Sequence, residues 1–304
     1  GIECFNVESA GELERISARA TLLQKVAPIA LRINPNVDPK THPYISTGLK
    51  ENKFGILQHT ALALYQQAAA DPHLQVRGVA CHIGSQICEP TPLFDALDQL
   101  LGLIDDLNAQ GITLTDLDLG GGFGVTYEDE QPFDVDAWGR HVVGKLAGRR
   151  LKLSIEPGRF LTANAGVLVT RVEYLKPEEG SDDDQQQGKN FAVIDAAMND
   201  LLRPSLYQAW HGVLPVQENR SASTKRWEIV GPVCESGDWL AKSRNLALHE
   251  GDLLSILSAG AYGSVLSSNY NSRNRAAEVM VSGESFRLVR RRESIQDQLS
   301  TEVL

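Results

Sequence analysis

Apolar and polar positions follow two different patterns along the chain, and the first pattern covers about its first half. Here short apolar and β-branched runs are separated by stretches with helical periodicity. Ser9 with Glu12 three residues later predicts a capping box that opens a helix, and apolar residues at helical spacing over 92–109, followed by Gly111, predict an amphipathic helix. Strand-like runs separated by helices are typical of βα units around a parallel sheet. The predicted strands are Phe5 to Glu8, Ile29 to Asn34, Val76 to Gly84, Leu114 to Gly120 and Leu151 to Glu156.

The second pattern begins near Ala165, where strand-like runs follow one another without long helices between them. Such a succession predicts an antiparallel β domain. Two polar, turn-rich stretches, 177–190 and 215–226, are interpreted as surface loops. The chain is therefore divided into a first domain at 1–165 and a second at 166–304. The predicted strands of the second domain are Val167 to Leu175, Phe191 to Ala196, Trp227 to Val233, Asp252 to Leu257, Glu278 to Val281 and Ser285 to Val289.

The number of strands in the first domain bears on the fold class. A (β/α)8 TIM-type barrel closes with about eight strands, and five would leave two edges with unpaired backbone groups. We therefore expect a partial barrel, and about a hundred further residues encoded upstream of Gly1, which is not a Met. The alternative is an open doubly wound sheet, but that fold usually has a glycine-rich phosphate turn after its first strand, and none follows Phe5 to Glu8.

Composition narrows the class of ligand. The chain has 304 residues, 22% charged residues and a formal net charge of −10, which argues against nucleic acid or an anionic membrane as main partner and favours a small molecule. The four cysteines form no CxxC pair, no apolar run has the length of a membrane span, and the first residues do not have the pattern of a signal peptide. We therefore expect reduced thiols and a cytoplasmic location.

Four of the predicted strands end in residues suited to chemistry, at the end where catalytic groups gather in parallel barrels. The three glycines at 120–122 are either a flexible turn or a backbone that can approach a phosphate closely. His82 has two interpretations: an ordinary histidine of the core or surface, or a residue that contacts a cofactor. Glu156 is either a surface charge or a carboxylate with a cationic partner, because its strand is apolar enough to be buried. The strand ends are Asn34, His82-Ile83-Gly84-Ser85, Gly120-Gly121-Gly122-Phe123-Gly124 and Glu156-Pro157-Gly158-Arg159.

In this order and spacing, the strand ends resemble the fold-type III pyridoxal-phosphate enzymes, a barrel plus β domain that includes alanine racemases and basic amino-acid decarboxylases. Within that group the chain is most similar to the diaminopimelate decarboxylase family, over nearly its whole length. The resemblance implies pyridoxal 5'-phosphate as cofactor, no metal site, and decarboxylation of meso-2,6-diaminopimelate to L-lysine and CO2, the last step of lysine biosynthesis. The motifs are Thr47-Gly48-Leu49, Lys53-Phe54-Gly55, His82 to Gln86, Glu156 to Phe160, Met198-Asn199-Asp200-Leu201, Arg203-Pro204, Cys234-Glu235-Ser236-Gly237-Asp238 and Ala261-Tyr262-Gly263.

The resemblance also implies roles for single residues toward the cofactor. His82 would lie against the face of the pyridine ring. Glu156 would keep the ring nitrogen protonated, so that the ring can accept the electron pair released with CO2. The expected phosphate ligands are Ser85, the backbone of Gly121 and Gly122, and the Tyr262 hydroxyl.

Toward the substrate, the resemblance implies two arginines for two carboxylates, a task that suits the planar guanidinium group. Cys234 and Glu235 would enter the active site of a neighbouring subunit, so we expect a homodimer with shared sites and an inactive monomer. Cys234 would act as the general acid and Glu235 would lie near the distal amine; the alternative for Cys234 is a buried apolar thiol. The expected substrate-binding residues are Arg159, Arg203, Tyr207, Glu235 and Tyr262.

One expected feature is absent. In the family, a lysine that forms the Schiff base lies in a Tyr-Ala-x-Lys-Ala-Asn type of motif at the end of the first barrel strand, and this sequence contains no such motif. Lys53 matches a different family position. We therefore expect this chain alone to be inactive. The open alternatives are a decarboxylase acting on ornithine, arginine or carboxynorspermidine, and a non-catalytic homologue that binds an active subunit.

Overall fold

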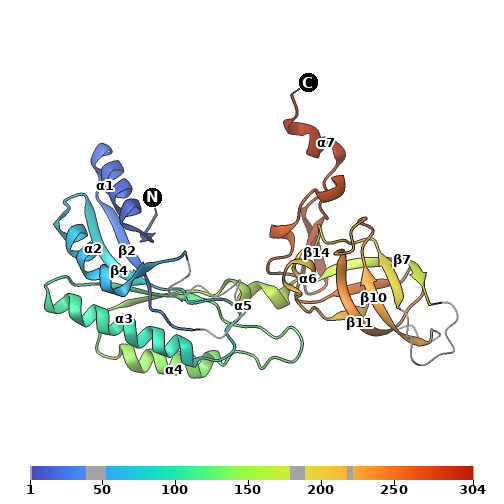
Figure 1. The fold of residues 1–304 in the computed structure, drawn as a ribbon, viewed down its shortest axis with the longest axis horizontal. Coiled ribbons are helices and arrows are strands. Elements are labelled where there is room, and N and C mark those ends of the chain that lie inside the picture. The colour runs from blue at the N-terminus through green and yellow to red at the C-terminus, as the bar shows by residue number, and fades with distance from the viewer. Residues whose placement is uncertain (1, 39–52, 179–188, 218–221, 304) are drawn as a thin grey trace. The chain divides into compact units, whose positions relative to one another are not determined.

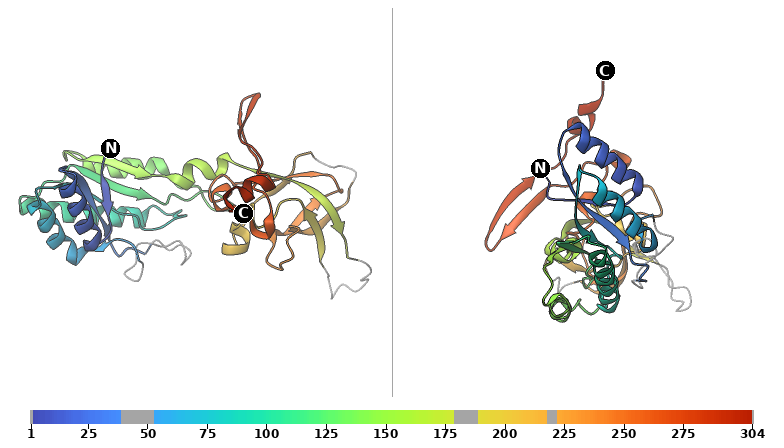
Figure 2. Two further views of the ribbon diagram at one scale, coloured as in Figure 1. Left: turned by 90° about the horizontal axis from the view of Figure 1, so that it is seen from above. Right: turned by 90° about the vertical axis from the view of Figure 1, so that its left-hand side faces the viewer.

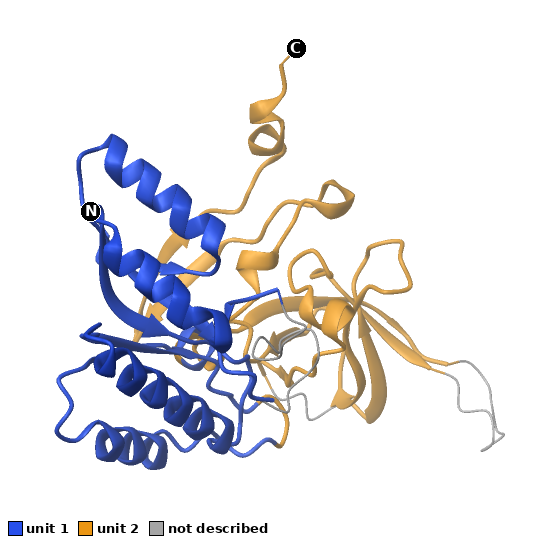
Figure 3. Cartoon of the chain, turned by 60° about the vertical axis from the view of Figure 1, so that its left-hand side comes forward, with its two compact units in different colours: residues 1–126, 130–160 blue, residues 127–129, 161–304 orange. Residues whose placement is uncertain are grey.

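The computed structural model describes residues 2–38, 53–178, 189–217 and 222–303. These residues form two compact units, shown in Figure 3: residues 1–126 with 130–160, and residues 127–129 with 161–304. The predicted domain boundary at 165 lies shortly after the end of the first unit. The three residues at 127–129 group with the second unit although their neighbours in sequence belong to the first.

The first unit is a parallel sheet with helices (Figure 1). Its strands run in the order β1-β2-β4-β5-β6, and β3 pairs with the end of β2. Within the described residues β1 and β6 each pair with a single neighbour, so the sheet is open. The elements are β1 (Phe5–Val7), α1 (Ala10–Leu22), β2 (Ala27–Asn34), β3 (Ile56–Leu57), α2 (Gln58–Ala70), β4 (Leu74–Ala80), α3 (Thr91–Ala109), β5 (Asp116–Gly121), α4 (Val135–Leu146), β6 (Lys152–Glu156) and α5 (Gly158–Thr162).

Alternation along the strands gives this sheet two different faces. Because successive side chains of a strand point to opposite faces, Leu31 and Leu117 join the apolar core with the helices, while their neighbours Arg32 and Asp118 point to the other face. The buried Tyr65 hydroxyl of α2 donates a hydrogen bond of 2.9 Å to the carbonyl of Gly78 in β4 and ties helix to strand. The helices thus cover the face that carries Leu31 and Leu117, while the opposite face carries polar side chains together with small residues such as Ala80.

All five strands predicted for the first unit are present, with three corrections. The strand predicted at Val76 to Gly84 is β4, which begins at Leu74 and already ends at Ala80. The two-residue strand β3 was not predicted, because so short a run carries no pattern. The last strand, β6, was expected to be buried, but Leu153 and Ile155 are exposed because β6 pairs only with β5 among the described residues.

The predicted helix starts and ends hold with one difference. The Ser9 side chain accepts from the backbone N–H of Glu12 at 3.2 Å, as expected of an N-cap. The Glu12 carboxylate, however, accepts from the N–H of Glu8 at 2.7 Å rather than from Ser9, so the reciprocal half of the predicted capping box is wrong. Gly111 has a φ of 82° just past α3, as predicted for the glycine that ends that helix.

The second unit contains a six-stranded sheet in the order β11-β10-β8-β7-β12-β9 and a separate hairpin, β13-β14. Its strand pairs are antiparallel except β8 with β10, which are parallel, so the prediction of a wholly antiparallel domain is corrected at this pair. The elements are β7 (Leu168–Lys176), β8 (Asn190–Ile194), α6 (Arg203–Tyr207), β9 (Val213–Pro215), β10 (Thr224–Val230), β11 (Trp239–Ala247), β12 (Leu253–Ile256), β13 (Glu278–Ser282), β14 (Ser285–Arg290) and α7 (Ile295–Gln298).

Two strands of this unit were not predicted. The nine-residue β11 contains Lys242, Ser243 and Arg244 in succession, and it bulges at Ser243, whose φ is 56°, so no clean alternation marks it in the sequence. The other is β9, which has three residues. The predicted loop at 215–226 is also shorter than expected, because β10 begins at Thr224.

Hairpin β13-β14 projects away from the six-stranded sheet of its unit (Figure 2). Apolar side chains on both strands are exposed, including Val281 at 68% and Phe286 at 79%. The core of the unit lies instead in the six-stranded sheet, around Val172, Ile229 and Leu254. Among the described residues, no helix combines the length and the apolar composition needed to cross a membrane.

Candidate active site

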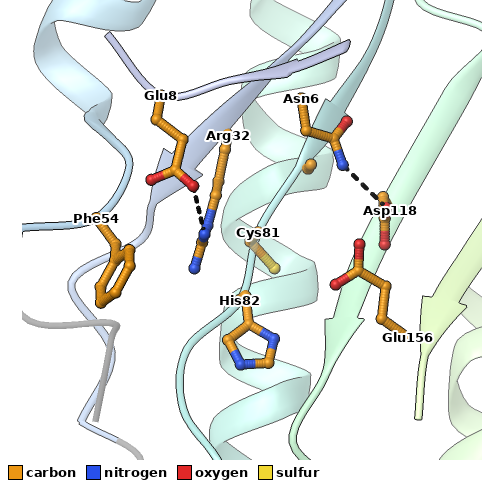
Figure 4. Close-up of a pocket in the computed structure, with 9 residues that line it drawn as sticks. Asn6, Glu8, Arg32, Phe54, Cys81, His82, Asp118 and Glu156 are labelled. Atoms are coloured by element: carbon orange, nitrogen blue, oxygen red, sulfur yellow. Dashed lines mark hydrogen bonds and ion pairs between the residues drawn. The ribbon is translucent and has the colours of Figure 1, made fainter. Parts of the chain in front are cut away.

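A cavity of about 470 Å³ opens on the polar face of the parallel sheet, a size typical of small-molecule sites (Figure 4). Its walls come from β1, β2, β4, β5 and β6 and from the segments that follow β1 and β4 and precede β3. Two of the predicted site residues, His82 and Glu156, lie in the walls. The full lining is Asn6, Glu8, Arg32, Phe54, Ala80, Cys81, His82, Asp118 and Glu156.

One side of the cavity is acidic. Glu156, the last residue of β6, and Asp118 of β5 place their carboxyl groups beside each other (Figure 4). Glu156 as a whole is exposed at the sheet edge, but partial burial of its carboxyl group, and then the neighbouring Asp118 charge, raise its pKa. Asp118 accepts from the Gly120 N–H at 2.9 Å and from the Asn6 amide at 3.4 Å. Two ionised carboxyl groups this close repel each other, which raises the free energy of the doubly ionised pair. A cation between or beside them would stabilise that pair.

The opposite side carries a fixed cation. The Arg32 guanidinium lies 2.6 Å from the Glu8 carboxylate and 5.1 Å from the centre of the Phe54 ring. The other Glu8 oxygen accepts from the Gly55 N–H at 3.2 Å. Because Glu8 is held in turn by the backbone, the Arg32 side chain has a defined place facing the acidic pair across the cavity (Figure 4).

His82 lies between these two sides, just after β4. Its Nδ1 accepts from the Gly121 N–H at 3.1 Å, which places the imidazole hydrogen on Nε2 when the ring is neutral. Burial, and then the positive charge of Arg32, lower the pKa of His82. The ring is therefore a neutral, oriented surface in the cavity wall.

The three glycines are required by close approach of neighbouring strand ends. A Cβ on Gly121 would lie 1.9 Å from the carbonyl oxygen of Glu156, and one on Gly122, whose φ is 97°, would lie 2.1 Å from the carbonyl oxygen of Gly84. The three glycines therefore do not form a flexible turn, and making room for an anion is not their single role. They let the ends of β4, β5 and β6 converge, and since the Gly121 N–H is already bonded to His82, this donor serves the histidine.

Ser85 and Arg159 meet in the same unit. The Arg159 guanidinium donates to the Ser85 hydroxyl oxygen from Nε at 3.3 Å and from Nη2 at 2.9 Å. Arg159 is buried, with 7% of the residue exposed. Because both hydrogen bonds end on the Ser85 oxygen, they leave the hydroxyl hydrogen of Ser85 directed elsewhere, so that Ser85 can act as a donor.

In the second unit, Cys234 and Glu235 lie on a loop whose shape is fixed by hydrogen bonds. The buried Asp238 carboxylate accepts from the N–H of Val233 at 2.8 Å and of Met198 at 2.7 Å, and burial raises its pKa. Tyr270 donates to the Glu235 carboxylate at 2.6 Å. Cys234 is exposed, so its alternative interpretation as a buried apolar thiol is wrong.

The remaining predicted residues also lie in the second unit. Arg203 and Tyr207 are four residues apart on the short helix α6, and therefore share a face of that helix. Tyr262 is 41% exposed and has a φ of 55°, in the left-handed region that a bulky residue seldom adopts. The structure thus gathers the site residues into two sets, one in each unit.

Residues 1–163 match the model of the family described as "pyridoxal-dependent decarboxylase, pyridoxal binding domain". The chain belongs to this decarboxylase family. The chain is 57% identical over 304 residues to the diaminopimelate decarboxylase of Pseudomonas aeruginosa, a match that covers 100% of this chain and 71% of the relative. It is 52% identical over 303 residues to the diaminopimelate decarboxylase of Neisseria meningitidis serogroup B, with 100% and 71% coverage.

Solved structures of such decarboxylases share the fold. The structure of the Helicobacter pylori diaminopimelate decarboxylase complexed with L-lysine has a TM-score of 0.91 and 40% identity, covering 98% of this chain and 72% of that chain. The M. jannaschii diaminopimelate decarboxylase in co-complex with L-lysine has a TM-score of 0.89 and 36% identity, covering 100% and 70%. The parallel sheet with its helices is therefore part of a TIM-type barrel, joined to a β domain.

The cavity also contains residues that were not predicted. Arg32 carried a signal, since it is the one charge in its strand. Asp118 alternates with leucines in β5, but so does Asp116, which does not line the cavity, so the sequence did not distinguish the two. Lys53 does not line the cavity; its ammonium group lies 5.2 Å from the Phe54 ring. The motif Thr47-Gly48-Leu49 lies outside the described residues. The other lining residues that were not predicted as site residues are Asn6, Glu8, Phe54, Ala80 and Cys81.

Proposed function

We propose that this chain carries the pyridoxal-phosphate-dependent decarboxylation of meso-2,6-diaminopimelate to L-lysine and CO2. The observation that supports it most directly is the cavity on the parallel sheet, in which an oriented neutral His82 lies beside the raised-pKa carboxyl of Glu156. Family membership and the identity to diaminopimelate decarboxylases select the substrate among those of related decarboxylases.

The residues present fit pyridoxal phosphate. The adjacent carboxyl groups of Glu156 and Asp118 favour a cation at their side of the cavity, and the protonated ring nitrogen of the cofactor is one. Arg32 on the opposite side suits an anionic substituent of the ring. When bound, the cofactor supplies the electron sink that accepts the electron pair left when CO2 departs.

Two residues would set how the ring lies. His82 would support one face of it, since the hydrogen bond from Gly121 fixes the plane of the imidazole. Glu156 would hold the proton on the ring nitrogen, and its ionised form would be stabilised by that contact at the expense of the contact with Asp118. The roles of His82 and Glu156 would then be orientation and charge, respectively, rather than proton transfer to the substrate.

For the phosphate group, the Ser85 hydroxyl is the hydrogen-bond donor that its neighbours orient best. Arg159 occupies its oxygen and so leaves its hydrogen for an anion. Gly121 and Gly122 would give room for close approach, while the Gly121 N–H remains with His82. Tyr262 would contribute a hydroxyl from the second unit.

The substrate would be held by its charged ends. Arg159 and Arg203, with Tyr207 and Tyr262, would bind carboxylate groups, because a guanidinium can donate two parallel hydrogen bonds to one. Glu235 would pair with the distal amine, and Cys234 would deliver the proton that replaces the lost carboxyl group. We further propose a homodimer in which this Cys234 and Glu235 serve the neighbouring subunit, and a cytoplasmic location.

The test uses the full-length gene product loaded with pyridoxal phosphate. We expect release of CO2 and L-lysine from meso-diaminopimelate, and a visible absorbance band from the bound cofactor. Ornithine, arginine and carboxynorspermidine serve as the competing substrates; faster turnover of any of these would assign the chain to another decarboxylase. A protein that binds a partner subunit but releases no CO2 from any of the four would be the non-catalytic homologue.

A further inference from the structure

The guanidinium group of Arg203 is oriented by two uncharged rings in its own unit. Arg203 opens helix α6 and is nearly buried, with 8% of the residue exposed. Its Nη1 lies 2.9 Å from Nε2 of His211, and its Cζ lies 4.4 Å from the centre of the Tyr127 ring. Neither neighbour carries a negative charge, so both can direct the guanidinium without neutralising it.

The hydrogen-bond partners of His211 define its tautomer. Its Nδ1 lies 2.8 Å from the carbonyl oxygen of Leu257, and a carbonyl can only accept, so the hydrogen is on Nδ1. Nε2 therefore has the lone pair that accepts from Arg203, and the imidazole is neutral. A protonated ring would have no acceptor for Arg203 and would place a second positive charge beside it. His211 is fully buried, which also favours the neutral form.

The imidazole is fixed to the sheet through its own backbone. Immediately after His211, the Gly212 carbonyl accepts from the Leu257 N–H at 2.8 Å, next to the antiparallel ladder of β9 and β12. Arg244 of β11 donates to the His211 carbonyl at 2.9 Å. Tyr127 meets the His211 ring edge-on at 5.4 Å between ring centres, so it supports both members of the pair. The position of Arg203 is thus set by the sheet, by way of the histidine.

We propose that His211 is a positioning residue that directs Arg203 toward a carboxylate group of a dicarboxylic amino-acid substrate. This rests on the proposed function, in which Arg203 binds such a carboxylate. A hydrogen bond from a charged donor contributes more than one between neutral groups, and a guanidinium that must be oriented on each binding event binds more weakly. His211 therefore acts on substrate affinity, not on the chemical step.

The experiment compares four variants of the cofactor-loaded, full-length protein. His211→Phe keeps a ring of similar shape and removes the acceptor, while His211→Gln keeps an acceptor near the position of Nε2. Arg203→Lys tests the premise. His141→Phe is the control, because His141 stacks on Phe94 in the first unit at 3.9 Å and a phenyl ring preserves that stack. KM and kcat for diaminopimelate are measured for each, together with the Kd of L-lysine by calorimetry and the unfolding temperature.

We expect His211→Phe to raise KM and the Kd of L-lysine about tenfold, with a much smaller change in kcat. His211→Gln should recover most of this loss, and His141→Phe should leave both constants unchanged. A strong effect of Arg203→Lys with none of His211→Phe would overturn this inference and leave the proposed function intact. If Arg203→Lys itself leaves both constants unchanged, the assigned role of Arg203 and this inference both fail.

A spectroscopic readout separates positioning from general stability. The nitrogen NMR shifts of His211 should report hydrogen on Nδ1 and a lone pair on Nε2 in the wild-type protein, and Arg203→Lys should move the Nε2 resonance most. Hydrogen on Nε2 in the wild type would overturn the proposal whatever the kinetics. If His211→Phe and His211→Gln lower kcat to the same extent, and also lower the unfolding temperature to the same extent, the role of His211 is only structural.

Discussion

Glu156 carries the largest share of the proposed chemistry for a single side chain. Glu156→Ala should lower kcat/KM for diaminopimelate on the order of a hundredfold, because a preorganised charge beside the ring nitrogen would be lost. It should also weaken binding of pyridoxal phosphate, measured by fluorescence titration. Glu14→Ala on α1 is the matched control and should change neither quantity. Decarboxylation at the parent rate in Glu156→Ala would remove the role assigned to this residue.

Asp118 offers a test by pH. The Asp118 charge contributes to the raised pKa of Glu156, so Asp118→Asn should lower that pKa. Since only ionised Glu156 pairs with a protonated ring nitrogen, cofactor affinity should fall as pH drops through this pKa. The fall should therefore occur at lower pH in Asp118→Asn than in the wild type.

The same titration on Asp116→Asn provides the control. Asp116 lies on the same strand but pairs with Arg77, and its replacement should leave the midpoint where it is. An Asp118→Asn midpoint equal to that of wild type, or shifted to higher pH, would mean that the two carboxyl groups do not interact as the cavity geometry indicates.

At the scale of elements, the convergence of strand ends depends on Gly122. With a φ of 97° and no room for a Cβ beside Gly84, Gly122→Ala should destabilise the protein by about 1 to 3 kcal/mol in urea unfolding. Gly102→Ala is the same change in the middle of helix α3, where a Cβ would have open space, and it should stabilise by about 0.5 to 1 kcal/mol. Effects of the same sign for the two variants would contradict the packing described for the glycine run.

The elements also show what a sequence can predict. Strands whose side chains alternate were found, most of them with near-correct bounds, because alternation is local. The segments with His82 and Glu156 followed from them, although β4 ends at Ala80, before His82. The bulged β11 was missed because its charges interrupt the pattern. The partners of Arg32 and Asp118 could not be predicted, since Glu8 and Asn6 lie 24 and 112 residues away in sequence and are brought there by the tertiary packing. His211 lies only 8 residues from Arg203, but no sequence pattern marks the two as a pair. The parallel pairing of β8 with β10 is likewise a property of the whole sheet.

At the scale of the whole molecule, the exposed loop of the second unit bears on assembly. Cys234 and Glu235 are exposed, yet Asp238 and Tyr270 hold the loop in one shape. A preformed loop with a thiol and a carboxylate loses little conformational entropy when it inserts into another surface. This arrangement supports a site completed by a second copy of the chain, in which one subunit supplies the cofactor cavity and the other supplies the loop.

Subunit mixing tests this sharing directly. Glu156→Ala and Cys234→Ala should each have little activity as a homodimer, because every site has one damaged contributor. When differently tagged full-length copies are co-expressed, each heterodimer contains one site with both an intact Glu156 and an intact Cys234. Random pairing should then restore about a quarter of wild-type activity. Mixing Glu156→Ala with Arg159→Ala should restore none, because both changes lie on the cavity side and damage one site each. Equal recovery in the two mixtures, or no recovery in the first, would place Cys234 in its own subunit's site or outside the reaction.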